Sequence, residues 1–114
     1  MIISSFSGID KANFRKEAVP VPELAQDAEI LIREMSGGEQ AEFQSRMTKP
    51  EFKNDEKAIV AYMLSISSVR EDGLRLFESE EDAGKFVDAV PAAVINRLNK
   101  VIWKLNNGQT EKNS

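Results

Sequence analysis

The sequence contains no cysteine and no histidine. Disulfide bonds, thiolate zinc sites, imidazole metal ligands, cysteine nucleophiles and Ser-His-Asp triads are therefore excluded. No stretch approaches the roughly 18 apolar residues that a bilayer span needs. The first residues also lack the basic start and the long apolar run of an export signal. We therefore expect a protein that works in a cytosol and does not bind a membrane.

What remains is an ordinary globular composition with a small acidic excess. The chain has 114 residues, of which 41% are hydrophobic and 30% charged, and its formal net charge is −4. This length predicts one domain over residues 1–114. The negative charge argues against a nucleic-acid partner, because phosphate backbones are bound by basic surfaces. We expect a mobile N-terminal arm at residues 1–13 and a frayed polar tail at residues 109–114.

The first third of the chain predicts a small antiparallel β-hairpin. Residues Phe14 to Pro22 alternate in polarity, and Pro20 and Pro22 cannot donate to a strand ladder, so this segment is an edge strand or an extended arm. Residues Glu29 to Met35 form the stronger strand candidate, with Ile30 and Ile32 on one face. A polar connection separates the two strands.

Helices follow the hairpin. Ser36 and Glu39 have the spacing of a capping box, which predicts a helix over residues 37–47 that ends before Lys49-Pro50. Apolar residues at helical spacing predict a buried helix from Asp55 to about Val69. The next segment, Glu71-Asp72-Gly73, is a turn in which Gly73 supplies a positive φ. We expect Leu74 to Phe77 to pair back with Ser68 to Arg70.

The C-terminal third predicts two more helices. Ser79 begins the first, with carboxylates in its opening turn, and Pro91 opens the second. The second carries a continuous apolar seam, formed by Val94, Ile95, Leu98, Val101, Ile102 and Leu105. Asn107-Gly108 is the expected C-terminal stop. The predicted fold is mainly α, with about four helices and a small N-terminal β-hairpin in a single compact domain.

An acidic segment is the densest cluster of charge in the chain. Between residues 71 and 82, six carboxylates stand against Arg75 alone; they are Glu71, Asp72, Glu78, Glu80, Glu81 and Asp82. The segment could hold a cation or imitate nucleic-acid phosphates, but it lacks the spacing of a calcium loop. We favour solvated carboxylates at a helix N-terminus, where the helix dipole stabilises them. We expect no metal, no cofactor and no catalytic residue.

Several residues are candidates for partner binding. Trp103 lies off the apolar seam, so its indole either covers the edge of the core or anchors a partner. Ile2, Ile3 and Phe6 belong to an arm that is frayed, packed on its own domain or inserted into a neighbour. Opposite charges could join copies head to tail into rings or spirals. The acidic members are Glu71, Asp72, Glu80 and Glu81, and the basic members are Arg97, Lys100 and Lys104.

The order of these segments resembles a known family. The chain has Phe14-Arg15-Lys16-Glu17-Ala18-Val19-Pro20-Val21-Pro22, then Ile30-Leu31-Ile32-Arg33-Glu34-Met35-Ser36-Gly37-Gly38-Glu39. It continues with Ser68-Val69-Arg70-Glu71-Asp72-Gly73-Leu74-Arg75-Leu76-Phe77 and ends in a helix that closes on Lys104-Leu105-Asn106-Asn107-Gly108. This pattern resembles the tail assembly chaperones of long-tailed, non-contractile (lambda-like) bacteriophages and related prophages. The resemblance spans roughly residues 14–108 and consists of element order and loop residues.

The resemblance implies a non-enzymatic function and specific partners. Such chaperones coat the tape measure protein, keep it soluble and recruit tail tube subunits, in many cases through a longer form made by ribosomal frameshifting. They act in the host bacterial cytoplasm and are absent from the mature virion. A small acidic chain with apolar patches and no catalytic group suits that role. The alternatives are an acidic phage-encoded inhibitor or antitoxin-like protein that occupies a basic nucleic-acid-binding surface, and, more distantly, an enzyme with a lysine or carboxylate centre.

Overall fold

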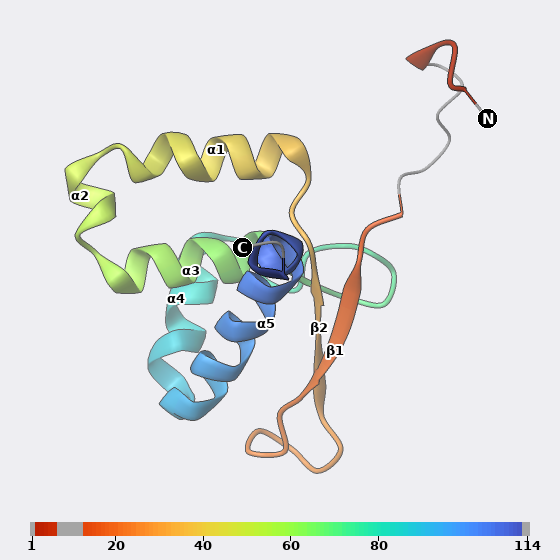
Figure 1. Ribbon diagram of the computed structural model, residues 1–114. Coiled ribbons are helices and arrows are strands. Elements are labelled where there is room, and N and C mark those ends of the chain that lie inside the picture. Colours follow the sequence, from red (N-terminus) through yellow and green to blue (C-terminus); the bar gives the residue numbers. More distant parts are fainter. Residues whose placement is uncertain (1, 7–12, 113–114) are drawn as a thin grey trace.

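The computed structural model describes residues 2–6 and 13–112, with side chains described as far as Asn107. Within these residues the helices lie on one side of a long β-hairpin (Figure 1). The elements follow in the order β1 (Lys16–Pro20), β2 (Glu29–Arg33), α1 (Gly37–Met47), α2 (Pro50–Lys53), α3 (Glu56–Ser67), β3 (Ser68–Val69), α4 (Glu80–Ala89) and α5 (Ala92–Lys112). The predicted class, mainly α with a small N-terminal β-hairpin in one compact domain, is confirmed.

The sheet contains the predicted hairpin and one further strand. β1 is an edge strand that pairs with β2 in antiparallel register, with Val19 opposite Ile30. Val19 and Ile30 are buried together with Ile32, so the alternation of the sequence places one face of the hairpin in the core. β3 pairs with the other edge of β2, where Ser68 lies opposite Ile32. The helix predicted to reach Val69 therefore ends at Ser67, because the next two residues join the sheet.

Two capping motifs fix the start of α1 and α4. The Ser36 hydroxyl accepts a hydrogen bond from the Glu39 amide at 3.1 Å, and the Glu39 carboxylate accepts one from the Ser36 amide at 2.8 Å. The predicted capping box and helix bounds are confirmed. Ser79 caps α4 by accepting a hydrogen bond from the Asp82 amide. The short helix α2 was not predicted; Pro50 occupies its first turn, where a missing N–H costs nothing.

The connection between β3 and α4 contains the predicted turn. Gly73 has a φ of 89°, a conformation that other residues adopt only with strain. Arg75 forms an isolated bridge with Val69, and the Arg70 amide donates to the Leu74 carbonyl at 2.7 Å. The segment after the turn therefore pairs back with β3, as predicted, through a single bridge.

The core is centred on α3 and α5. Every residue of α3 from Ala61 to Ser67 is buried, as expected for a helix that is apolar on most of its surface. The predicted seam of α5 is confirmed, since all six of its residues are buried. Leu98 and Ile102 are 0% exposed, so α5 supplies some of the most completely covered side chains in the molecule.

The predicted end of α5 is wrong. The helix does not stop at Asn107-Gly108 but continues to Lys112. A glycine inside a helix costs only about 1 kcal/mol relative to alanine, which does not by itself end the helix. The Asn106 side-chain amide also donates to the Ile102 carbonyl at 2.8 Å, within the helical turn, instead of marking a cap. The expected mobile arm and frayed tail fall partly on residues 1, 7–12 and 113–114, which lie outside the described residues, and these expectations stay predictions.

Candidate partner-binding groove

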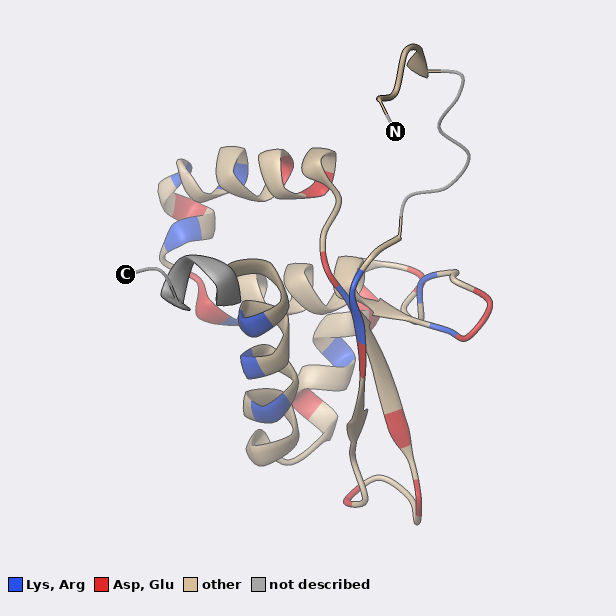
Figure 2. Ribbon diagram, turned by 45° about the vertical axis from the view of Figure 1, so that its right-hand side comes forward, with Lys and Arg blue, Asp and Glu red and all other residues tan. Residues whose placement is uncertain are grey.

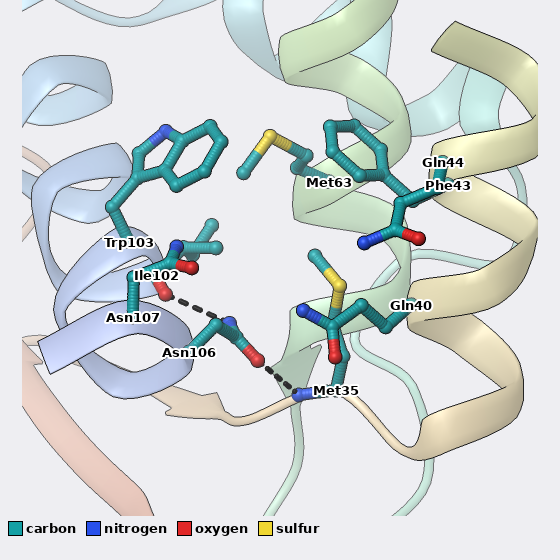
Figure 3. Close-up of a pocket in the computed structure, with 9 residues that line it drawn as sticks. All are labelled: Met35, Gln40, Phe43, Gln44, Met63, Ile102, Trp103, Asn106 and Asn107. Carbon is teal, nitrogen blue, oxygen red and sulfur yellow. Dashed lines mark hydrogen bonds between the residues drawn. The ribbon is translucent and has the colours of Figure 1, made fainter. Parts of the chain in front are cut away.

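A small groove opens between α1 and the C-terminal half of α5, and it is the candidate site. Its volume is about 100 Å³, and its floor consists of Phe43, Met63, Ile102 and the side chains near them. The full lining is Met35, Gln40, Phe43, Gln44, Met63, Ile102, Trp103, Asn106 and Asn107. No residue of this lining carries a charge. Figure 3 shows the indole, the two thioethers and the amides turned toward one shared space. We call it the Trp103 groove.

The floor of the Trp103 groove belongs to a row of aromatic rings. Trp103 meets Phe43 edge-on, with ring centroids 6.4 Å apart, and Phe43 stacks on Tyr62 at 6.2 Å. Tyr62 in turn meets Phe52 edge-on at 5.9 Å. Such pairs each stabilise the fold by about 0.5–1.5 kcal/mol beyond the burial of their surface. The row therefore holds one wall of the groove rigidly against α2 and α3.

Arg46 covers the far end of this row. Its guanidinium lies 4.3 Å from the Phe52 centroid and 4.2 Å from the Tyr62 centroid, which is a cation–π arrangement. The same guanidinium is paired with Glu80, and this hydrogen bond raises the pKa of Arg46. Burial raises the pKa of the Tyr62 hydroxyl, and the charge of Glu42 adds to this effect. Tyr62 is therefore a neutral structural residue at neutral pH.

Asn106 fixes the mouth of the Trp103 groove. Its side-chain oxygen accepts a hydrogen bond from the Met35 amide at 2.9 Å, so the end of β2 is tied to α5 (Figure 3). Nearby, the Arg15 guanidinium donates to the Leu105 carbonyl and pairs with Glu34. The hydrogen bond from the Arg15 amide lowers the pKa of the Glu34 carboxyl. The sheet and α5 are thus joined by polar contacts next to the groove.

The position of Trp103 is compatible with both predicted roles, covering the edge of the core and anchoring a partner. Its contact with Phe43 covers the edge of the core, yet 45% of the side chain remains exposed. Tryptophan is enriched among the residues that contribute most of the binding energy at protein interfaces. Its role in partner binding remains a prediction.

The apolar residues of the N-terminal segment are uncovered. Ile2 is 89% exposed, Ile3 59% and Phe6 88%. Every other aromatic side chain of the chain lies against a described partner: Phe14 under Arg33, Phe77 against Phe86, and the remaining rings in the aromatic row. Phe6 thus differs from the other aromatic residues of the chain in its exposure to solvent. The structure does not bring it to the Trp103 groove of its own chain.

The acidic segment lies on the surface, in the β3–α4 connection and the start of α4 (Figure 2). Several of its carboxylates have partners in the same chain: Asp72 pairs with Arg70, Glu80 with Arg46, and Glu81 with Lys85. Glu71 is exposed. Within residues 2–6 and 13–112, no group of three or more acidic side chains is arranged to hold a metal ion. Asp72, Glu80 and Glu81 therefore already have basic partners within the chain.

Two basic residues of α5, Arg97 and Lys104, pair with carboxylates of the hairpin. Arg97 makes a bidentate pair with Glu23, at 2.6 and 2.9 Å, and also donates to the Pro20 carbonyl at 2.9 Å. This pairing lowers the pKa of the Glu23 carboxyl from 4.5 to about 2 and raises the pKa of Arg97. Lys104 pairs with Glu17, while Lys100 is exposed. A partner that bound Arg97 or Lys104 would therefore compete with contacts inside the chain.

Sequence reasoning identified Trp103 but missed most of the groove that surrounds it. Met35, Met63 and the four carboxamide side chains were not predicted as site residues. A signal was available for two of them, because Gln40 and Gln44 are one helical turn apart on the side of α1 that also carries Phe43. Asn107 was interpreted, together with Gly108, as a helix stop instead. The contribution of Asn106 and Asn107 depends on the approach of β2, which no local pattern shows.

The comparisons with known proteins agree with this architecture. No family model and no curated protein sequence matches the chain. Among solved structures, the chain is similar to one described as the structure of the bacteriophage HK97 tail assembly chaperone, with a TM-score of 0.60 and 23% sequence identity. The match covers 86% of each chain. In the part of the chain that the structure describes, no helix has the length and apolar character needed to cross a membrane. The chain therefore shares the fold of a phage tail assembly chaperone.

Proposed function

We propose that this protein is a non-enzymatic tail assembly chaperone of a lambda-like phage or prophage. It binds and coats the tape measure protein, keeps it soluble and helps to recruit tail tube subunits. It acts in the host bacterial cytoplasm and is absent from the mature virion. The observation that carries this proposal is the shared fold with the HK97 tail assembly chaperone over 86% of both chains.

The chemistry of the described surface supports a binding role. The Trp103 groove is apolar, uncharged and about 100 Å³ in volume, which is the scale of one large side chain. Further apolar side chains are exposed outside it, among them Leu74 at 61% and Leu76 at 41%. A chaperone for a long, aggregation-prone rod needs such patches on a small body, so that many copies can cover it.

Co-expression with the tape measure protein encoded in the same phage genome tests the proposal. We expect the tape measure protein to move from the pellet to the soluble fraction and to copurify with this chain. A matched control is the Leu98→Ala variant, whose core defect should reduce the solubilising effect in proportion to the loss of folded protein. A tape measure protein that stays insoluble beside well-folded chaperone would contradict the proposal.

Self-association and a longer form are further parts of the proposed function. We propose that copies assemble into rings or spirals around the client, and that a frameshifted longer form contacts the tail tube protein. Mass spectrometry of the chaperone purified from infected or induced cells tests the second point. It should reveal a minor species that shares the N-terminal peptides of this chain and continues past its C-terminus.

A further inference from the structure

Two uncovered apolar features of the same chain have matching chemistry. One is the Trp103 groove, with its apolar floor and its rim of the carboxamides Gln40, Gln44, Asn106 and Asn107. The other is the N-terminal segment Ile2-Ile3-Ser4-Ser5-Phe6, which carries three exposed large apolar side chains and no charge. An uncharged groove favours an uncharged occupant, because a charged side chain would lose its hydration there without gaining a counter-ion.

The composition of the segment also fits the rim of the groove. Serine hydroxyls donate and accept hydrogen bonds, and carboxamides do the same. The Ser4 hydroxyl can therefore pair with the amides of the rim while an apolar side chain enters the floor. The other exposed apolar residues fit less well: Leu74 lies between Gly73 and Arg75, and Leu24 follows Glu23. The groove, at about 100 Å³, is smaller than the cavity of about 150 Å³ that accepts benzene, so it takes one side chain at most and an aromatic ring enters it only in part.

We propose that the N-terminal segment of one copy docks in the Trp103 groove of a second copy, with Phe6 as the anchor. The inference rests on the self-association included in the proposed function and names the contact that produces it. In the single chain, Phe6 is 88% exposed and the groove is open, so neither feature is covered by its own chain. A second copy covers both features at once.

The geometry of this contact allows assembly to continue beyond two copies. The segment and the groove are different surfaces, so the contact is head to tail. A pair of copies therefore keeps one unoccupied groove and one undocked segment, to which further copies can bind. Contacts of this type produce closed rings or open spirals instead of stopping at a dimer. Apolar burial supplies the affinity, so raising the salt concentration should leave the assembly largely intact.

The first test uses the single tryptophan of the chain, which lies in the groove. A synthetic peptide with the sequence of residues 1–8 is titrated into the Phe6→Ser protein, and Trp103 fluorescence is recorded. We expect a saturable change. A peptide that carries the same Phe6→Ser change should bind at least about tenfold more weakly. No saturable change, or equal binding of the two peptides, would overturn the proposal.

The second test distinguishes a neighbouring copy from the same chain. The sequence has no cysteine, so Ser4→Cys and Gln44→Cys proteins, which both keep Phe6, can be mixed and oxidised without background disulfides. We expect a disulfide-linked heterodimer, which should be much less abundant when Leu24→Cys, on the hairpin connection, replaces Gln44→Cys. If the chain carrying both Ser4→Cys and Gln44→Cys instead closes an internal disulfide and the mixture yields no heterodimer, the segment docks on its own chain and the proposal is wrong.

Sedimentation at several protein concentrations measures whether the exposed Phe6 is needed for association. The Phe6→Ser protein should stay monomeric at concentrations where the unchanged protein associates, and Leu74→Ser, at another exposed leucine, should associate normally. Because both sites are exposed, neither change should affect folding. Equal association of the Phe6→Ser and unchanged proteins would overturn the proposal. None of these tests contains the tape measure protein, so their failure is distinguishable from failure of the proposed function.

Discussion

The apolar side chains of α5 lie in two very different surroundings. From Val94 to Ile102 the seam is enclosed by α3 and the sheet, and Leu98 is 0% exposed. One residue later, Trp103 keeps 45% of its side chain in solvent beside an open groove. The seam stabilises the domain, whereas Trp103 leaves an apolar surface available beside it. The apolar pattern of a helix therefore does not show which of its residues fill the core and which remain exposed to a partner.

The largest effect is expected from a substitution in the buried part of α5. Leu98→Ala should lower the free energy of unfolding by about 2–5 kcal/mol, because it removes fully buried methyl groups and leaves a cavity. Urea denaturation followed by circular dichroism measures the change. Leu74→Ala is the matched control, and its effect should stay within about 0.5 kcal/mol since Leu74 is largely exposed. An unchanged midpoint for Leu98→Ala would place the seam outside the core.

A change at Trp103 sharpens the comparison, because it should separate binding from stability. Trp103→Ala should weaken self-association about tenfold or more. Its effect on unfolding should be smaller, about 1–2 kcal/mol, since much of the indole is already in solvent and the edge contact with Phe43 is the main loss. Sedimentation at several protein concentrations and urea denaturation measure the two effects. Lys104→Ala should weaken association less, and the reverse order would mean that charge holds the assembly.

The capping box of α1 provides a smaller effect at the opposite wall of the groove. Ser36→Ala removes the acceptor for the Glu39 amide and should destabilise the protein by about 1 kcal/mol. Because α1 carries Gln40 and Phe43 into the groove, the loosened first turn should also weaken docking of the N-terminal peptide. Ser36→Asp, which retains a capping oxygen, should restore both properties. Identical stability of the alanine and aspartate variants would show that the cap is not needed.

The smallest effect concerns the ion pair between the hairpin and α5. The pKa of Glu23 is about 2 in the folded protein and near 4.5 when unfolded, so the paired carboxylate stabilises the fold above about pH 4.5. This stabilisation is lost as the pH falls through 2. The Glu23→Gln variant should therefore melt below the unchanged protein at pH 7, and the difference should shrink as the pH approaches 2. A difference in melting temperature that is independent of pH would contradict the pairing with Arg97.

Local sequence signals predicted the elements of this fold well, and they failed where distant segments meet. The capping box at Ser36, the turn at Gly73 and the seam of α5 depend on residues close in sequence, and all three are confirmed. The end of α3 was wrong because Ser68 and Val69 pair with β2, about 36 residues earlier in the chain. The end of α5 was wrong because a lone glycine weakens a helix without ending it.

The groove shows the same limit more strongly. Trp103 was conspicuous as an aromatic residue beside an apolar seam, but its surroundings come from β2, α1, α3 and α5 together. The Met35–Asn106 hydrogen bond joins residues 71 positions apart. The interpretation of Arg97 as a contact for a neighbouring copy also ignored Glu23, which the hairpin brings to it. Composition and spacing carry no information about such approaches.

The central claim is that this protein coats the tape measure protein, and the stoichiometry of their complex tests it most directly. Light scattering coupled to size exclusion gives the mass of the complex formed with the full tape measure protein and with a version shortened to half its length. Coating predicts many bound copies, with the number falling in proportion to client length. One or two copies bound regardless of length would contradict the account, because the protein would then recognise a local site instead of covering the rod.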